Sequence, residues 1–155
     1  MLNDKTILIT GGTGSFGRKF VEVALRDYKP RKVIVLSRDE LKQHEMNQKF
    51  PAGPGKVMRY FLGDVRDADR LYRAFRELDL VVHAAALKQV PACEYNPFEA
   101  IKTNILGTKN VIDAAIARKV PKVMAISTDK AVNPINLYGA TKLCAEKMVI
   151  QANSY

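Results

Sequence analysis

The sequence predicts an α/β fold, a doubly wound parallel sheet flanked by helices. Short apolar runs alternate with longer amphipathic segments along the chain, which is the order of parallel strands joined by right-handed helical crossovers. The apolar runs are nearly continuous, as in strands that are covered on both faces. A glycine-rich turn connects the first run to the first amphipathic segment. Together these observations indicate a Rossmann-like sheet.

The expected elements follow from the spacing of apolar residues and from turn residues. Strands are expected at residues 5–10, 32–37, 56–64, 79–86 and 122–127. Helices are expected at residues 15–27, 38–50, 67–78 and 98–118, and from residue 137 to the end. Residues 51–55 should form a loop, and Pro91 and Pro97 bracket a stretch that we expect to be irregular. The carboxyl ends of the first, second, fourth and fifth strands should line one ligand crevice.

Length and composition indicate one soluble domain. A chain of 155 residues suits a single domain, and its 47% apolar and 26% charged residues are ordinary for a globular protein. No apolar run approaches the roughly 20 residues that span a bilayer, and the N-terminus shows no signal peptide. We therefore expect a cytoplasmic protein with no membrane partner. The net charge of +9 is scattered over the sequence, which argues against a nucleic-acid partner.

The two cysteines, Cys93 and Cys144, are too few for a disulfide framework. We expect both to be small, buried and reduced, because free cysteines are usually buried. Neither lies at a metal-ligand spacing, so no metal site is expected.

The glycine turn at residues 10–17, TGGTGSFG, has the spacing GxxGxxG between a strand and a helix. Glycine allows the sharp turn, lets backbone amides approach a pyrophosphate, and lets the helix pack on the strand. The start of the helix offers unpaired N–H groups and a partial positive charge to phosphates. We therefore assign to cofactor binding Gly11, Thr13, Gly14, Ser15, Phe16 and Gly17.

The segment LSRDE at the end of the second strand should distinguish the two nicotinamide cofactors. Ser37 and Arg38 could hold the 2′-phosphate of NADP, whereas Asp39 could accept a hydrogen bond from the free 2′-hydroxyl of NAD. Because the residue directly after the strand normally points into the pocket, we favour Arg38 and NADP. Lys42, one turn into the next helix, could add a second cation.

The ends of the third and fourth strands complete the expected cofactor site. Asp64 could accept from the adenine amino group with Val65 beneath the ring, and Asp67 is the better N-cap for the following helix. We expect His83 to be a packed, hydrogen-bonded core residue rather than a ligand. Small side chains after the fourth strand would let a flat cofactor lie against the backbone at Ala84, Ala85 and Ala86.

The segment STDKAVNPINLYGATK, residues 127–142, places Tyr138 and Lys142 four residues apart on the last helix. They therefore share one face of that helix. An ammonium beside a phenol favours the phenolate, which makes the tyrosine a usable base. The same lysine can hydrogen-bond the nicotinamide ribose. A Tyr-x-x-x-Lys pair after a dinucleotide-binding half is the pairing found in short-chain dehydrogenases/reductases.

Essentially the whole chain resembles the inverting UDP-N-acetylglucosamine 4,6-dehydratases, which are extended short-chain dehydrogenases/reductases. The resemblance rests on the segments TGGTGSFG, SRDELKQ, GDVRD, HAAALKQVPACEYNP, KTNILGTKNV and STDKAVNPINLYGATK. It implies an NADP-dependent dehydration of UDP-N-acetylglucosamine, with inversion at C5, to a 4-keto-6-deoxy sugar nucleotide. Such products serve the synthesis of pseudaminic acid-type sugars for surface polysaccharides and flagellin glycans.

The resemblance also implies catalytic roles for four residues. Tyr138, assisted by Lys142, would take the proton of the 4-hydroxyl while hydride leaves C4 for NADP⁺. Lys130 would remove the C5 proton, and Asp129 would protonate the departing 6-hydroxyl. A lysine base must be neutral to act, which burial or neighbouring cations would have to favour.

Further binding residues are implied in the same way. Lys88 would touch the cofactor or the substrate. Thr103 and Asn104 would line the nicotinamide end of the cofactor site. Thr128 would lie beneath the substrate, which Asp129 and Tyr138 would also contact.

Members of this family continue into a smaller sugar-nucleotide domain, whereas this sequence has 155 residues. We therefore expect residues 1–155 to be a truncated NADP-binding domain that carries the catalytic residues, without the C-terminal substrate domain. The resemblance implies a homo-oligomer with a UDP-sugar substrate. Two alternatives stay open. One is a sugar-nucleotide 4-epimerase or reductase, which has no use for Asp129 and Lys130, and the other is a non-catalytic NADP-binding module.

Overall fold

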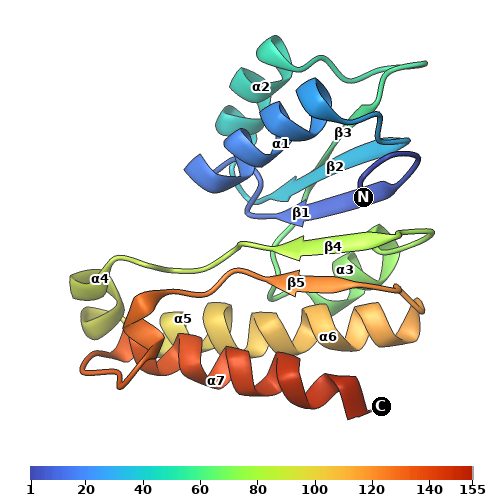
Figure 1. Ribbon diagram of the computed structural model, residues 1–155. Coiled ribbons are helices and arrows are strands. Elements are labelled where there is room, and N and C mark those ends of the chain that lie inside the picture. The colour runs from blue at the N-terminus through green and yellow to red at the C-terminus, as the bar shows by residue number, and fades with distance from the viewer. Residues whose placement is uncertain (155) are drawn as a thin grey trace.

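A computed structural model describes residues 1–154, and Figure 1 shows how they are arranged. These residues form a five-stranded parallel sheet in the order β3-β2-β1-β4-β5. The strands are β1 (Thr6–Thr10), β2 (Lys32–Ser37), β3 (Met58–Leu62), β4 (Leu80–His83) and β5 (Val123–Ala125). The chain starts in the middle of the sheet and winds outward first to one edge and then to the other. The predicted doubly wound fold is therefore confirmed.

Helices cover both faces of the sheet (Figure 1). On one face, α1 and α2 pack through Val21 and Met46, and on the other α3 and α6 pack through Leu71 and Val111. The last helix, α7, lies beside α6. The helices are α1 (Ser15–Asp27), α2 (Glu40–Lys49), α3 (Ala68–Ala74), α4 (Val90–Tyr95), α5 (Pro97–Ile101), α6 (Gly107–Ala117) and α7 (Leu137–Gln151).

The apolar run of β1 is continuous because both faces of this strand are buried. Leu8 packs into the cluster under α3 and α6, whereas Ile7 and Ile9 pack into the cluster under α1 and α2. All three side chains are fully buried. Burial of each contributes about 1.5–3 kcal/mol relative to exposure, so the central strand is held from both faces.

The region between β4 and α6 differs from the prediction. Residues 90–95 form α4 rather than an irregular stretch, because Pro91 and Pro97 lie in the first turns of helices, where a missing N–H costs nothing. The expected helix at 98–118 is divided into α5, a π-helical turn (Lys102–Leu106) and α6. Gly107 ends this turn where a Cβ would lie 2.7 Å from Val65, so α6 packs closely against the segment that follows β3.

Strands β3, β4 and β5 are shorter than predicted at both ends, and the residues beyond their carboxyl ends form the rim of a crevice. The expected last helix ends at Gln151, and residue 155 lies outside the described residues. Cys93 is buried as predicted, but Cys144 is exposed, because it lies on the outer side of α7. Across residues 1–154, no helix combines the length and the apolar character needed to cross a membrane.

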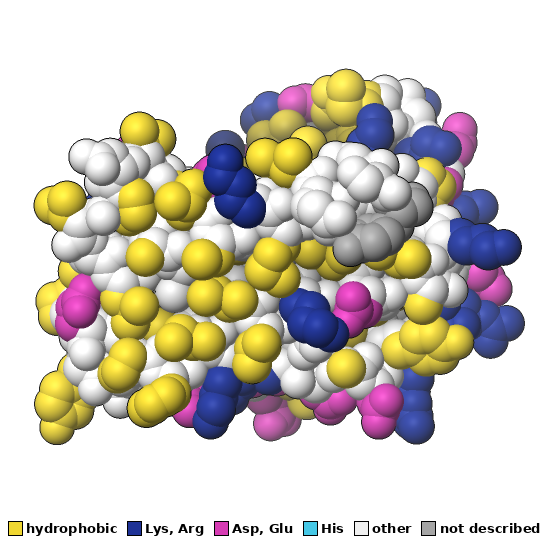
Figure 2. Space-filling model, turned by 90° about the horizontal axis from the view of Figure 1, so that it is seen from below, with side chains coloured by type: hydrophobic (Ala, Val, Ile, Leu, Met, Phe, Trp, Pro, Cys, Tyr) yellow, Lys and Arg dark blue, Asp and Glu magenta, His cyan; other side chains and the backbone are white. Residues whose placement is uncertain are grey.

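Figure 2 shows the molecule from below, on the side where α6 and α7 lie in Figure 1. Apolar side chains are spread widely over this face, with few charged side chains between them. Ile116 of α6 and Ile150 of α7 are among the exposed large apolar residues of the chain. These outer helices therefore expose more apolar surface than a solvated helix face usually does.

Candidate functional site

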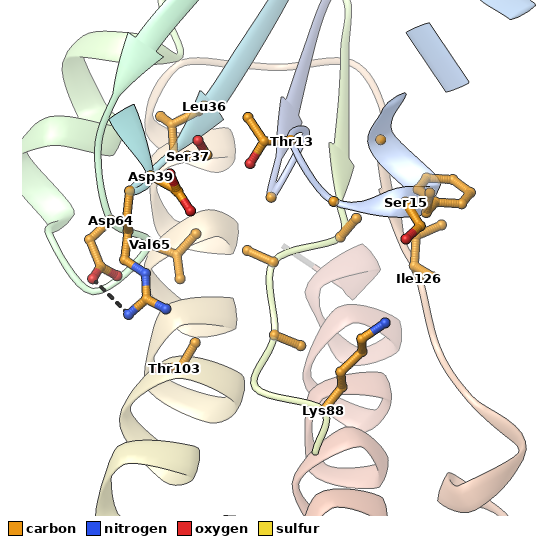
Figure 3. A pocket seen from close by; sticks show the side chains of 18 of the residues that line it. Thr13, Ser15, Leu36, Ser37, Asp39, Asp64, Val65, Lys88, Thr103 and Ile126 are labelled. Atoms are coloured by element: carbon orange, nitrogen blue, oxygen red, sulfur yellow. Dashed lines mark ion pairs between the residues drawn. The ribbon is translucent and has the colours of Figure 1, made fainter. Parts of the chain in front are cut away.

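A crevice of about 490 Å³ lies at the carboxyl edge of the sheet (Figure 3). The segments that follow all five strands line it, together with Thr103 of the π-helical turn and the start of α7. It brings together most of the residues that the sequence proposed: Gly11, Thr13, Gly14, Ser15, Phe16, Gly17, Ser37, Arg38, Asp39, Lys42, Asp64, Val65, Ala84, Ala85, Ala86, Lys88, Thr128, Tyr138 and Lys142. Among the proposed site residues, Asn104, Asp129 and Lys130 do not line it.

The glycine turn is closely packed at one end of the crevice. Gly11 has φ +65°, and a Cβ there would lie 2.8 Å from the backbone of Ala85. A Cβ at Gly17 would lie 2.3 Å from the carbonyl oxygen of Gly12. Side chains are thus excluded where the turn meets β4 and where α1 meets the turn. Gly14 begins α1 with no side-chain cap, so the first amides of this 13-residue helix are available to a ligand.

The end of β2 presents a cation rather than a free carboxylate. Asp39 caps α2 by accepting from the backbone N–H of Lys42 at 2.9 Å, and the ammonium of Lys42 lies 3.1 Å from the same carboxylate. These contacts lower the pKa of Asp39. The side chain of Arg38 is half exposed in the crevice, and Ser37 is held by the side chain of Gln43. Arg38 is therefore less engaged than Asp39.

Asp64 faces two arginines at the rim of the crevice. Its carboxylate lies 2.9 Å from Arg66 and 3.5 Å from Arg38. The dashed line in Figure 3 marks the ion pair between Asp64 and Arg38. Burial acts to raise the pKa of Asp64, but the hydrogen bonds from Arg66 and the charge of Arg38 lower it overall. The prediction that Asp67 caps the following helix is confirmed, since its carboxylate accepts from the N–H of Arg70 at 2.8 Å.

Helix α7 brings Tyr138 and Lys142 to the crevice on one face, next to the end of β5. Asn136 begins the helix by accepting from the N–H of Gly139 at 2.8 Å. Lys142 is only 5% exposed, and its ammonium donates to the carbonyl of Ile126 at 2.6 Å. Burial lowers the pKa of Lys142, and Glu146 partly opposes this effect. The buried lysine is thus held at a fixed place beside the crevice.

Asp129 and Lys130 lie in a short 3₁₀ turn, Asp129–Ala131, outside the crevice lining. Their side chains are 86% and 49% exposed, with 3.4 Å between the Lys130 ammonium and the Asp129 carboxylate. The hydroxyl of Thr128, and then the charge of Lys130, lower the pKa of Asp129. The structure does not bring these two residues into the crevice with Tyr138, and it favours the ionised rather than the protonated form of Asp129.

Asn104 lies behind the crevice rather than in it. Its buried amide accepts from the N–H of Leu87 and donates to the carbonyl of the same residue, each at 2.8 Å. Its hydrogen-bonding groups are therefore engaged by the protein, which differs from the expected cofactor contact. Its neighbour Thr103 does line the crevice, and its buried hydroxyl has no hydrogen-bond partner within residues 1–154.

Other lining residues were not proposed from the sequence, namely Leu36, Gly63, Ile126 and Ser127. Each adjoins a predicted strand end, so the rule that ligands bind beyond the carboxyl ends could have found them. The prediction for His83 is confirmed: it is buried and hydrogen-bonded to Thr10 and Thr108. In the described part of the chain, no three His, Cys, Asp or Glu side chains are grouped to bind a metal.

The chain is similar to known sugar-nucleotide dehydratases and epimerases. Residues 7–155 match the model of a family described as "Polysaccharide biosynthesis protein". The chain is 59% identical over 154 residues to a UDP-N-acetylglucosamine 4,6-dehydratase (inverting) of Campylobacter jejuni, covering 99% of this chain and 45% of that protein. It is 47% identical to a UDP-glucose 4-epimerase of Rickettsia canadensis, covering 97% of this chain and 44% of that one. The chain thus spans a little under half of these relatives.

Solved structures share the fold. The X-ray structure of Pen from Bacillus thuringiensis has a TM-score of 0.93 at 47% identity, covering 99% of this chain and 46% of that one. The dTDP-glucose 4,6-dehydratase DesIV from Streptomyces venezuelae, solved with NAD and TYD bound, has a TM-score of 0.84 at 26% identity, covering 97% of this chain and 52% of that one. From the family match over residues 7–155, the chain belongs to the polysaccharide biosynthesis protein family.

Proposed function

We propose that the crevice binds NADP and that Tyr138 and Lys142 begin the 4,6-dehydration of UDP-N-acetylglucosamine there, with inversion at C5. The observation that carries the proposal is that Tyr138 and Lys142 line the same crevice as the glycine turn. The 59% identity to an inverting dehydratase supports this choice of reaction. The reaction is proposed for the whole protein, and its product would serve surface polysaccharide or flagellin glycan synthesis.

The crevice residues fit a dinucleotide. The close packing of Gly11 and Gly17 leaves a cradle of backbone amides at the start of α1, where a pyrophosphate would be stabilised. The buried hydroxyl of Thr103 lacks a partner within residues 1–154, and leaving such a group unpaired costs about 1–3 kcal/mol. A polar ligand that fills the crevice would supply the partner.

Arg38 supports NADP over NAD. Its side chain is half exposed at the crevice and has one long contact, 3.5 Å to Asp64, whereas the carboxylate of Asp39 serves as a helix cap and faces Lys42 at 3.1 Å. A free 2′-hydroxyl would thus share its acceptor with Lys42, whereas a 2′-phosphate would find a guanidinium that can donate two hydrogen bonds. The related DesIV was solved with NAD, so the preference for NADP rests on these residues of the present chain.

The residues at the nicotinamide end suit hydride chemistry at C4 of a sugar. When bound, the nicotinamide cofactor accepts hydride from C4 and later returns it to C6. Tyr138 takes the proton of the 4-hydroxyl, and the buried ammonium of Lys142 favours the phenolate that can accept it. Both groups lie on one face of α7, so the base and its partner reach the sugar together.

Elimination of water is assigned to the turn that precedes α7. Lys130 removes the C5 proton, Asp129 protonates the departing 6-hydroxyl, and reprotonation of C5 from the other face inverts that centre. The support is that the turn lies close to Tyr138 in space. The backbone of Lys130 packs so closely on Gly139 that a Cβ at Gly139 would lie 2.1 Å from the carbonyl oxygen of Lys130. Gly139 directly follows Tyr138. Since both side chains are exposed and the ionised form of Asp129 is favoured, this step requires the substrate to draw them in and Asp129 first to take up the proton that it donates.

Incubation of the purified protein with UDP-N-acetylglucosamine and NADP⁺ in D₂O tests the proposal. Dehydration predicts loss of one water from the sugar nucleotide and one deuterium at C5, read by mass spectrometry and NMR. A 4-epimerase, favoured by the 47% identity to a protein of that name, would change the configuration at C4 without losing water. Binding of NADPH without any change in the sugar would refute the dehydratase proposal and support the alternative of a non-catalytic NADP-binding module.

We also propose a cytoplasmic homo-oligomer. The apolar face over α6 and α7 (Figure 2) supports self-association, because monomers rarely expose wide apolar patches. The free thiol of exposed Cys144 suits a reducing compartment. Light scattering of the purified protein and cell fractionation test the two statements, and a monomeric mass or an exported protein would contradict them.

A further inference from the structure

A chain of buried polar groups runs behind the crevice and begins at His83, the last residue of β4. His83 is 2% exposed and lies between two threonine hydroxyls. Its Nδ1 is 2.7 Å from Oγ1 of Thr10, at the end of β1, and its Nε2 is 3.0 Å from Oγ1 of Thr108, in α6. The imidazole therefore bridges the strand that leads into the glycine turn and the helix that follows the π-helical turn.

The neighbouring contacts fix the direction of each hydrogen bond. The hydroxyl of Thr108 donates to the carbonyl oxygen of Asn104 at 2.6 Å, so its one proton is used and its oxygen accepts from Nε2–H of His83. Nδ1 then carries no proton and accepts from the hydroxyl of Thr10. The oxygen of Thr10 in turn accepts from the backbone N–H of Ala85 at 3.2 Å. Only the Nε2–H tautomer satisfies every member of this chain.

Asn104 extends this hydrogen-bond network to α7, the helix that carries Tyr138 and Lys142. Beyond its two bonds to Leu87, its amide donates to Oγ1 of Thr141 at 3.0 Å. The hydroxyl of Thr141 donates to the carbonyl oxygen of Tyr138 at 2.8 Å. These hydrogen bonds connect His83 to the first turn of α7 by way of Asn104, which takes part through its backbone on one side and its side chain on the other.

We infer that His83, as the neutral Nε2–H tautomer, is a positioning residue that sets the crevice walls relative to one another. The inference rests on the proposed function, because the groups that it positions are those assigned to the cofactor and to Tyr138. On the Thr10 side it fixes Ala85, whose backbone contacts Gly11 of the glycine turn. On the Thr108 side it fixes Asn104 and, through it, α7.

A protonated ring would not fit between these partners. A proton on Nδ1 would face the oxygen of Thr10 and leave the hydroxyl proton of that residue without its acceptor. Burial, and then the positive charge of Lys142, lower the pKa of His83 to about 3. The geometry and the surroundings therefore agree on a neutral imidazole.

The tautomer is measured directly by ¹⁵N NMR of the histidine side chains in the whole protein. The inference predicts a protonated Nε2 and an unprotonated Nδ1 for His83, unchanged over the neutral pH range. A protonated Nδ1, or signals averaged by exchange between tautomers, would overturn it. This measurement needs no enzymatic activity, so it stands even if the dehydratase assignment fails.

Two substitutions separate the branches of the network. The amide of His83→Gln can replace Nε2–H toward Thr108, whereas that of His83→Asn can replace only Nδ1 toward Thr10. In a single turnover with UDP-N-acetylglucosamine, reduction of bound NADP⁺ should be about tenfold slower in His83→Asn than in His83→Gln, because loss of alignment at α7 slows the hydride step. The affinity for NADP should change less than this rate.

Equal rates in the two variants, or rates that simply follow their loss of thermal stability, would contradict a positioning role. If either variant does not fold, Thr108→Val and Thr10→Val provide the same comparison, with the slower turnover expected for Thr108→Val. If the unaltered protein reduces no NADP⁺ with this sugar nucleotide, the proposed function fails, and NMR still decides the tautomer.

Discussion

The ammonium of Lys142 donates to the backbone carbonyl of Ile126 across 2.6 Å, and this contact joins the helix that carries Tyr138 to the end of β5. Lys142 is 5% exposed. A buried ammonium with a backbone acceptor is held in place. Its side chain cannot swing into solvent as an exposed lysine can. The face of α7 that we assign to catalysis is therefore anchored to the strand edge where the crevice opens.

Replacement of this lysine should slow the first chemical step. Lys142→Met keeps much of the buried aliphatic stem but removes the charge that favours the phenolate of Tyr138, so reduction of bound NADP⁺ by the sugar nucleotide should slow by at least about 100-fold. Stopped-flow absorbance measures the step. Lys147→Met, a change at an exposed position of the same helix, serves as the control and should retain the rate. A normal rate in Lys142→Met would remove Lys142 from the mechanism.

Arg38 should determine which dinucleotide binds. Arg38→Ala removes a charge-assisted contact to the 2′-phosphate, so the affinity for NADP should fall by roughly 10–100-fold while that for NAD changes little. Calorimetric titration with both dinucleotides measures the difference. Arg73→Ala, at an exposed arginine of α3 outside the crevice lining, is the control. An equal loss for both dinucleotides would contradict the assignment of NADP.

Lys130 should act after the first hydride transfer. Lys130→Ala should still show the cofactor absorbance change that accompanies oxidation at C4, but water should no longer be lost from the sugar, because the base for C5 is missing. The absorbance and the mass of the sugar nucleotide are followed in the same sample. Loss of both steps would indicate a structural role, as would retention of dehydration at the normal rate.

Stability should depend on pH through His83. The pKa of this residue is about 3 in the folded chain against an ordinary value of 6.5, so between these values only the unfolded state binds the proton. The contribution of the neutral His83 to the free energy of unfolding is complete above about pH 6.5. It is lost as pH falls toward 3, and the free energy of unfolding decreases by about 1.4 kcal/mol per pH unit.

His83→Gln lacks this titration and provides the comparison. Denaturant unfolding of both proteins between pH 6 and 4 should show a steeper loss of unfolding free energy in the unaltered protein. Parallel slopes would mean that His83 binds its proton equally well in the folded and unfolded states, and the neutral buried imidazole would then be wrong.

The regular part of the fold was predictable from local pattern. Runs such as KVIVLS gave β2 at residues 32–37, and the glycine turn gave α1 at residues 15–27, both with the observed bounds. The signal is strong in these elements because each strand buries both faces and each helix follows a clear turn. The N-cap at Asp67 and the core placement of His83 followed from equally local chemistry.

The misses depended on long-range contacts. Pro91 and Pro97 were expected to bracket an irregular stretch, but they lie in the first turns of short helices. A proline is tolerated there because the N–H that it lacks would not be paired within the helix, and the sequence does not show where such a turn begins. Within the π-helical turn at 102–106, Thr103 lines the crevice whereas Asn104 bonds to Leu87. An ordinary helix pattern gives no sign of that division. The sequence also did not show that the side chains of Asp129 and Lys130 are exposed, and their catalytic roles stay a prediction.

Transfer of a label within the sugar tests the central claim most directly. The purified protein is given UDP-N-acetylglucosamine carrying deuterium at C4, and the product is examined by NMR. A dinucleotide held by the glycine turn beside Tyr138 would take this deuterium and return it to the same sugar, so the label should be found at C6 of a 4-keto product. Deuterium that stays on C4, or that exchanges into the solvent, would contradict the account.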